Sequence, residues 1–272
     1  MTDHYAVIGN PVAHSKSPLI HNAFARQTSQ DMDYGMVLAP LGGFADAVRR
    51  FRAEGGRGLN VTVPFKLDAY ALATELTGRA RSAGAVNTLK FDGDVALGDN
   101  TDGAGLVADI VTQLDVPLAA KRVLLMGAGG AARGVVLPIL RERPALLAIA
   151  NRTVGKALAL AQESAAHGMV RGGSYADFAA QRFDVVVNAT SASLTGEVPP
   201  LSDAIFAPDA LAYDMVYGDE PTAFMTQAKA RGAARVADGL GMLIAQAAES
   251  FVLWRGVRPD ARPVMHLLRP GE

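Results

Sequence analysis

A strand of apolar residues runs directly into a glycine-rich turn near the middle of this chain. Residues 122–126 are followed by Gly127-Ala-Gly129-Gly130-Ala-Ala132, and a helical pattern begins within that turn. In this setting the glycines permit a tight turn and a close backbone approach, and the helix N-terminus attracts an anion such as a pyrophosphate. The pattern therefore predicts part of a doubly wound parallel sheet that binds a dinucleotide. The alternative is a purely structural turn between a strand and a helix.

The next predicted strand ends in a group of polar residues. Asn151, Arg152 and Thr153 follow it directly, and Lys156 lies one turn later. Sites for NAD usually carry an acidic residue here that accepts from the ribose 2′-hydroxyl, and none is present. Two cations suit the 2′-phosphate of NADP instead, because arginine can bind a phosphate through two parallel hydrogen bonds. The alternative is that both are surface charges at a helix start.

The first hundred residues alternate between strand-like and helical patterns. The strand-like runs cover residues 5–9, 33–39 and 58–63, and helical patterns follow Ser17-Pro18 and begin near Gly43. Such alternation predicts a parallel sheet covered by helices. A hairpin is expected at the end of this series, because two strand-like runs flank Asp92-Gly93-Asp94.

A second alternating series begins at the strand before the glycine-rich turn. It continues through strand-like residues 145–150, 184–187 and 211–215, with a helix over 154–166. A helix over 106–114 lies between the two series, and we expect it to carry the chain from one domain to the next. The last predicted helix, residues 239–254, has an apolar stripe with Gln246 beside it.

Composition narrows the class of protein further. With 26 basic and 27 acidic residues the net charge is −1, so no overall attraction to nucleic acid or anionic lipid is expected. The absence of cysteine excludes disulfides and cysteine nucleophiles. His4, His21, His167 and His266 lack metal-ligand spacing, so no metal site is expected. The chain shows no leader-like start and no apolar run of about 18 residues, which makes a cytoplasmic protein the expectation.

A strand with a polar end is predicted at residues 60–66. Asn60 and Thr62 share one face of this strand, because side chains alternate along it. Pro64 cannot continue a sheet ladder, and Lys66 then falls in the first turn of a helix, where the helix dipole disfavours a cation. A lysine in such a position suits proton transfer. The alternative is a half-exposed strand followed by a solvated lysine.

Two serines lie at the start of the first predicted helix. Ser17 suits the N-cap and Pro18 the first helical position, but capping leaves Ser15 unexplained. A pair of hydroxyls at a helix N-terminus can hold a carboxylate.

A second polar segment covers residues 98–103. Thr101 or Asp102 could cap the helix that follows. Capping needs only one of them, so the other is available for another role.

Taken together, these motifs resemble the shikimate dehydrogenase family across almost the whole chain. The segments that carry the resemblance occur in the order of the family. They are residues 9–18, 60–66, 84–88, 98–103, 127–133, 151–153, 188–191, 213–217 and 238–243. The resemblance implies an NADP-dependent oxidoreductase that interconverts 3-dehydroshikimate and shikimate on the route to chorismate and the aromatic amino acids.

The resemblance also implies a two-domain α/β fold. An N-terminal α/β domain that binds the substrate would comprise residues 1–103 and 238–272. A Rossmann-type doubly wound domain that binds NADP would comprise residues 104–237, and the C-terminal helix would return to the first domain. The expected partner is a small-molecule substrate, with no nucleic acid and no membrane, and a homodimer is left open.

Residue roles follow from the resemblance position by position. Lys66 and Asp102 would form the catalytic pair. The substrate would be contacted by Ser15 and Ser17 at its carboxylate, by Asn60, Thr62, Asn87, Asp102 and Gln246 at its ring hydroxyls, and by Tyr217 at its junction with the cofactor. The cofactor would be contacted by Gly127, Ala128, Gly129, Gly130, Ala131, Asn151, Arg152, Thr153, Lys156, Thr190, Met215 and Gly239.

One position departs from the family pattern. Ser193 stands where the family is expected to have a glycine after residues 188–190. If that position needs a positive φ, serine adds strain or shifts the loop.

Two other functions stay open. The first is an NAD-dependent quinate/shikimate dehydrogenase, although no acidic residue stands near Asn151. The second is a non-catalytic NADP sensor, which would not need Lys66 and Asp102 together with a full set of hydroxyl-binding residues.

Overall fold

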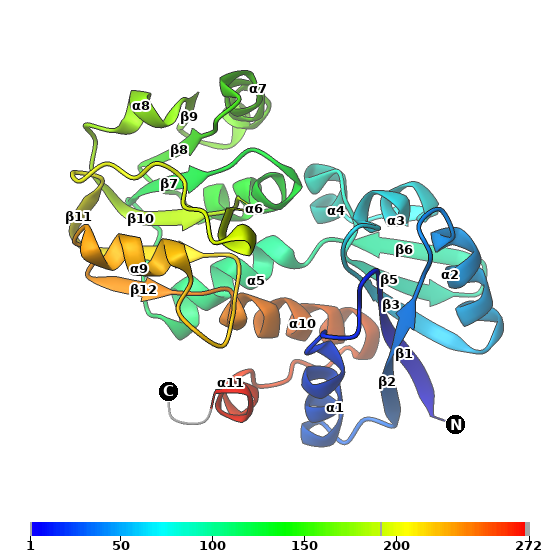
Figure 1. Ribbon diagram of the computed structural model, residues 1–272. Coiled ribbons are helices and arrows are strands. Elements are labelled where there is room, and N and C mark those ends of the chain that lie inside the picture. The colour runs from blue at the N-terminus through cyan, green and yellow to red at the C-terminus, as the bar shows by residue number, and fades with distance from the viewer. Residues whose placement is uncertain (1, 191, 270–272) are drawn as a thin grey trace. The chain divides into compact units, whose positions relative to one another are not determined.

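The chain divides into two compact units, and the computed structural model describes residues 2–190 and 192–269 (Figure 1). The first unit contains the chain up to Gly105 and again from Ile244, and the second unit contains Leu106–Leu243. The chain passes between them within two helices, α5 (Asp102–Ala108) and α10 (Leu240–Arg255). Within the described residues, no helix has both the length and the apolar character needed to cross a membrane.

The first unit is built on a six-stranded sheet with the order β2-β1-β3-β5-β6-β4. Its strands are β1 (Asp3–Gly9), β2 (Met32–Leu38), β3 (Gly56–Val61), β4 (Glu75–Leu76), β5 (Thr88–Asp92) and β6 (Val95–Asp99). The strands β1, β2 and β3 are parallel, whereas β5 is antiparallel to both of its neighbours. The hairpin predicted around Gly93 is therefore confirmed, and it makes this sheet mixed.

Helices cover both faces of the first sheet. They are α1 (Ser17–Gln27), α2 (Phe44–Ala53), α3 (Lys66–Leu72), α4 (Gly78–Ala83), the later part of α10, and α11 (Arg262–Leu268). One core joins Phe44 and Phe65 to strand residues such as Leu59 and Leu89. The rings of Phe24 and Phe251, from α1 and α10, meet 5.8 Å apart.

The second unit is a parallel sheet with the order β12-β11-β10-β7-β8-β9. Its strands are β7 (Arg122–Met126), β8 (Leu146–Ala150), β9 (Val170–Gly173), β10 (Phe183–Asn188), β11 (Phe206–Asp214) and β12 (Arg235–Ala237). Its main helices are α6 (Gly130–Arg141), α7 (Val154–Ser164), α8 (Tyr175–Phe178) and α9 (Ala223–Ala230). The order reverses between β7 and β10, as in a doubly wound sheet.

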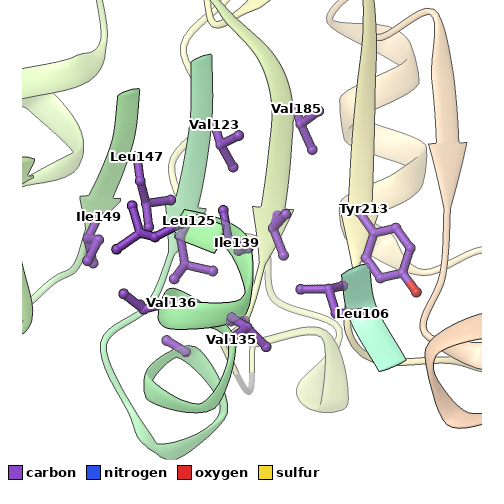
Figure 2. Close-up of a cluster of buried hydrophobic side chains, with 14 of the residues drawn as sticks. Leu106, Val123, Leu125, Val135, Val136, Ile139, Leu147, Ile149, Val185 and Tyr213 are labelled. Carbon is purple, nitrogen blue, oxygen red and sulfur yellow. The ribbon is translucent and has the colours of Figure 1, made fainter. Parts of the chain in front are cut away.

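Both faces of the second sheet are buried. Val123 and Leu125 belong to the core cluster of Figure 2, where they meet apolar side chains of α6. Leu124 and Met126, which alternate with them along β7, belong to a separate cluster. Burial on both faces explains the continuous apolar run that marks this strand in the sequence.

Two features of the second unit differ from the sequence-based expectation. The edge strands β9 and β12 were not predicted, because they are short and only partly apolar.

The helix predicted over 106–114 is α5 followed by a π-helical turn, Asp109–Gln113. Asp109 begins that turn, accepts a hydrogen bond of 2.6 Å from the Tyr213 hydroxyl, and has a pKa raised to about 6 by burial. Single π-helical turns of this kind occur frequently at functional sites.

His21 of α1 is fully buried in the first unit. Its ring stacks on Tyr34 at 4.3 Å and lies 5.2 Å from Trp254. Neither ring nitrogen has a hydrogen-bond partner among the described residues. Burial lowers the pKa of His21 to about 3, so the ring is neutral and serves as an aromatic packing element.

We predict that His21→Phe stabilises the protein. The substitution keeps the stack and removes two unpaired buried nitrogens, which should raise the free energy of unfolding by about 1–2 kcal/mol at pH 7. The gain should grow as the pH falls from 6.5 towards 3, by up to about 1.4 kcal/mol per pH unit, because only the unfolded wild-type histidine binds a proton there. Urea denaturation at several pH values measures both effects. His266→Phe, at an exposed histidine, is the control, and equal pH dependence of wild type and His21→Phe would contradict this account.

Candidate functional site

A lysine and a carboxylate form a direct pair in the first unit. Strand β3 ends at Val61, and α3 begins at Lys66. The Nζ atom of Lys66 donates a hydrogen bond of 2.6 Å to Oδ2 of Asp102, the first residue of α5. The side chains remain 34% and 15% exposed, so the pair is accessible to a small molecule while water is partly excluded. A charge-assisted hydrogen bond of this length orients the ammonium group.

Asn87 connects this pair to the C-terminal helix. Its Nδ2 atom lies 2.8 Å from Oδ1 of Asp102, 2.9 Å from Oγ1 of Thr101 and 3.3 Å from Oε1 of Gln246. An amide has only two N–H groups, so it can serve two of these acceptors at once. The structure therefore brings together four predicted site residues, namely Lys66, Asn87, Asp102 and Gln246.

Asn60 is 6% exposed, and its Nδ2 donates to the backbone carbonyl of Asn87 at 3.4 Å. Its Oδ1 accepts a hydrogen bond of 2.7 Å from the Tyr34 hydroxyl, and its Nδ2 lies 3.0 Å from Ser250 Oγ and 3.2 Å from Thr88 Oγ1. In this arrangement Asn60 supports its neighbours, and its contact with a ring hydroxyl stays a prediction. Thr62 is half-buried, with its backbone N–H donated to the carbonyl of Ile8.

Ser250 and Thr88 support the site and were not predicted from the sequence. Ser250 lies one turn beyond Gln246 on α10, is fully buried, and lies 2.8 Å from the hydroxyl of Thr88. Their partners are distant in sequence, so no local pattern could identify them. A serine among apolar helical positions was the only available signal.

The serines at the start of α1 differ from the expectation. The N-cap is Lys16, its side chain makes no capping hydrogen bond, and Ser17 is the first helical residue. The predicted N-cap at Ser17 is therefore wrong. Ser15 Oγ accepts the backbone N–H of Ser17 at 3.2 Å, so the upstream serine supports the helix start. Binding of a carboxylate by Ser15 and Ser17 stays a prediction.

A buried ion pair fixes the segment that leads to Asp102. Asp99 is fully buried and accepts from Nε and Nη2 of Arg79 at 3.1 and 2.5 Å, a two-point contact. Asp99 also accepts the backbone N–H of Asn100 at 2.8 Å. Arg79 reaches Glu249 of α10 through Nη1 at 2.8 Å. The chain thus enters α5 with a geometry set by a buried charge network.

The glycine-rich turn of the second unit leaves an open helix start. Gly127 has φ +112°, and a Cβ there would lie 3.1 Å from the carbonyl oxygen of Ala189. A Cβ on Gly129 or Gly130 would meet nothing within 4 Å. Helix α6 begins at Gly130 without a side-chain cap. Backbone N–H groups that face open space can hold a pyrophosphate, and Ala128 and Ala131 flank them with small side chains.

The polar residues after β8 include two exposed cations at the start of a helix. Asn151 donates to the carbonyl of Thr153 at 2.9 Å, which shapes the turn before α7. Arg152 and Lys156 are exposed, and neither forms an ion pair within residues 2–190 and 192–269. Two unpaired cations at a helix start fit a phosphate dianion.

Backbone segments after β11 and β12 are in close contact. The N–H of Gly239 donates to the carbonyl of Val216 at 3.1 Å. A Cβ on Gly239 would lie 2.3 Å from the carbonyl oxygen of Met215, so only glycine fits. Burial raises the pKa of Tyr217, and the nearby charge of Asp238 raises it further.

Ser193 has a structural partner that its family position did not suggest. It is not among the positive-φ residues of the described chain, so the strain considered for serine does not arise. Its hydroxyl donates to Oδ2 of the buried Asp214 at 2.6 Å and accepts from Asn188 at 3.0 Å. Thr190 donates to Oδ1 of Asn188 at 2.7 Å, which links the loop after β10 to the same network.

These features define a two-unit α/β oxidoreductase of the dinucleotide-dependent class, with a glycine-rich turn at an uncapped helix start in one unit and a lysine–aspartate pair in the other. Three family models match the chain: the shikimate dehydrogenase substrate binding domain at residues 7–89, shikimate / quinate 5-dehydrogenase at 109–195, and the shikimate 5′-dehydrogenase C-terminal domain at 239–269. The chain belongs to the shikimate dehydrogenase family.

Individual relatives match over nearly the full length. The shikimate dehydrogenase (NADP(+)) of Nitrosospira multiformis is 60% identical over 99% of this chain and 98% of the relative. An Ael1 enzyme from Pseudomonas putida is 50% identical, with a TM-score of 0.94 over 98% of each chain. Shikimate 5-dehydrogenase of Thermus thermophilus, solved with NADP(H) and shikimate, is 31% identical, with a TM-score of 0.87 over 99% of each chain. The predicted α/β fold with a Rossmann-type unit is confirmed.

We predict that Arg79→Met destabilises the protein strongly. It leaves the buried carboxylate of Asp99 unpaired, which should lower the free energy of unfolding by about 3–5 kcal/mol. Chemical denaturation measures the loss. The matched control is Arg49→Met, which breaks an exposed pair with Asp46 and should cost less than about 1 kcal/mol. Equal losses for the two variants would contradict the role given to Asp99.

Proposed function

We propose that this protein catalyses the reversible NADPH-dependent reduction of 3-dehydroshikimate to shikimate, a step in aromatic amino acid biosynthesis. The observation that carries the proposal is the 2.6 Å hydrogen bond between Lys66 and Asp102, held within one network with Asn87 and Gln246. Family membership supplies the substrate class, and this network supplies polar groups for a small hydroxylated ring. The reaction makes the protein an oxidoreductase that acts on a CH–OH group.

The second unit holds the cofactor. The turn from Gly127 to Ala131 binds the pyrophosphate at the uncapped start of α6. Arg152 and Lys156 bind the 2′-phosphate, and Asn151, Thr153 and Thr190 shape the surrounding loops. Met215 and Gly239 flank the nicotinamide. When bound, NADPH supplies the hydride.

The first unit holds the substrate. Ser15 and Ser17 bind its carboxylate at the start of α1. The ring hydroxyls are contacted by Asn60, Thr62, Asn87, Asp102 and Gln246. Tyr217, which belongs to the second unit, contacts the substrate where it meets the cofactor. Apart from Tyr217, the substrate and the cofactor are assigned to residues of different units.

Lys66 and Asp102 carry out proton transfer to and from the substrate oxygen. In the reduction direction the carbonyl oxygen of the substrate would gain negative charge, and the ammonium group of Lys66 would donate a hydrogen bond and then a proton to that oxygen. Asp102 keeps the ammonium aimed at that oxygen through their short hydrogen bond. In the oxidation direction Lys66 takes the hydroxyl proton back. In the reduction direction the substrate gains a C–H bond and an O–H bond while an N–H bond of Lys66 breaks, and Lys66 would regain its proton from solvent. The hydride would come from the reduced nicotinamide.

We also propose that the protein works in the cytoplasm, where NADPH is available to biosynthetic enzymes. A homodimer stays a prediction, and light scattering of the purified chain measures it. The catalytic residues proposed here all come from one chain.

We predict that Lys66→Met lowers kcat by about 100- to 10,000-fold, because proton donation and alkoxide stabilisation are lost together. NADPH affinity should be unchanged, since the cofactor residues lie in the second unit. Absorbance of the nicotinamide with shikimate and NADP, and with quinate or NAD as alternatives, measures the activity. Lys121→Met, at a half-exposed ion pair with Asp184 in the second unit, is the control. Activity of Lys66→Met near that of the control would overturn the role of Lys66.

We predict that replacing both Arg152 and Lys156 by glutamine weakens NADP binding by roughly 10- to 100-fold, because charge-assisted hydrogen bonds to the 2′-phosphate are lost. NAD lacks that phosphate, so its dissociation constant should change little. Isothermal titration with each cofactor gives the comparison. An equal loss of affinity for NADP and NAD would show that the two cations do not bind the 2′-phosphate.

A further inference from the structure

Tyr175 and Arg152 lie at matching positions just beyond two neighbouring strands of the second sheet. Strands β8 and β9 are parallel neighbours, with Ala150 opposite Gly173. The N–H of Asn151 donates to the carbonyl of Gly173 at 3.1 Å, so the pairing continues to the end of both strands. Arg152 lies two residues after Ala150, and Tyr175 lies two residues after Gly173. Both are at the carboxyl edge of the sheet, where α8 starts (Figure 1). Ligands of doubly wound sheets bind at this edge.

A capping box holds Tyr175 in place. Ser174 Oγ accepts the N–H of Asp177 at 3.2 Å, and Asp177 accepts the N–H of Ser174 at 2.7 Å. Gly173 allows this close packing, because a Cβ there would lie 2.9 Å from Asp177 Oδ2. Tyr175, the first residue of the helix, therefore has a fixed backbone.

The side chain of Tyr175 is half-buried and has a polar neighbour. Its buried part packs against the core cluster that contains Met126 and Phe178. Burial raises the pKa of the Tyr175 phenol, and the positive charge of Arg152 opposes that shift. The pairing of Ala150 with Gly173 places both residues at matching positions beyond the ends of β8 and β9. An aromatic ring next to a guanidinium group offers two planar groups to a heteroaromatic base.

We propose that Tyr175 binds the adenine base of the cofactor, with Arg152 at the adjoining 2′-phosphate. This inference rests on the proposed NADP-dependent function. It makes Tyr175 a binding residue for the adenosine half, outside the glycine-rich turn and the cation pair.

The strand order places the other half of the cofactor elsewhere. Met215 and Gly239, assigned to the nicotinamide, follow β11 and β12, and β11 is three strands from β8 in the order β11-β10-β7-β8. At about 4.8 Å per strand this separates the two sites by roughly 14 Å. An extended dinucleotide across the glycine-rich turn of β7 would therefore have its base near β8 and β9.

The alternative is that Tyr175 only packs against the hydrophobic core and does not contact the cofactor. Two substitutions separate the accounts: Tyr175→Phe keeps the ring, and Tyr175→Leu keeps apolar bulk but removes the ring. Adenosine 2′,5′-bisphosphate is the probe, because it carries the base and the 2′-phosphate without nicotinamide. Leu158→Ala, which truncates an exposed apolar side chain on α7, is the control in the same unit.

We expect Tyr175→Leu to weaken binding of adenosine 2′,5′-bisphosphate by about 3- to 10-fold in calorimetric titration, in the range of one aromatic contact to a base. Tyr175→Phe and Leu158→Ala should bind as the wild type does. In NMR spectra of the bound probe, the adenine H2 and H8 signals should shift upfield for wild type and Tyr175→Phe, and this ring-current shift should be lost in Tyr175→Leu.

Wild-type affinity and an unchanged adenine shift in Tyr175→Leu would overturn the proposal. A loss of binding that matches a lowered unfolding temperature, without loss of the ring-current shift, would assign Tyr175 to the core alone. Failure of the wild-type protein to bind the probe or NADP would instead contradict the proposed function, so the two failures are distinguishable.

Discussion

The buried polar groups of the first unit have to be satisfied inside the protein, and this requirement governs the geometry of the proposed catalytic centre. Asn60, Asn87, Thr101 and Ser250 are almost fully removed from water and bond to one another and to Gln246. An unpaired buried polar group costs about 1–3 kcal/mol, so a shift of one member would disturb the others. Because Asn87 also bonds to Asp102, the position of the proposed catalytic pair depends on this network.

In the second unit, close backbone contacts determine the geometry of the proposed cofactor site. Gly127 allows the turn after β7 to pass the carbonyl of Ala189, and Gly172 lets β9 approach the carbonyl of Ala157. Gly239 allows the segment before α10 to contact Met215. These contacts bring the ends of the parallel strands close together and leave backbone N–H groups at the start of α6 open. The result is an edge that suits an extended anionic ligand.

Local patterns were sufficient for much of the fold. The glycine-rich turn predicted the doubly wound unit, because few other settings require glycine at a strand-to-helix turn, and Asp92-Gly93-Asp94 predicted the hairpin. The patterns failed where tertiary contacts prevail. Serine is a residue type that often occupies the N-cap, yet Lys16 occupies that position here and Ser17 is buried. Ser193 was considered a source of strain and instead donates to the buried carboxylate of Asp214.

The sequence by itself determined the class of fold, the family and the types of group available for chemistry, because periodicity, turn chemistry and motif order are local properties. It could not show that Asn60 bonds to Tyr34, Thr88 and Ser250, since Ser250 lies 190 residues away along the chain. Nor could it align Tyr175 with Arg152 beyond the ends of β9 and β8, because β9 carries too weak an apolar pattern to be predicted. Only the tertiary structure decided these pairings, since strand register and burial bring distant residues together and force their polar atoms to find partners.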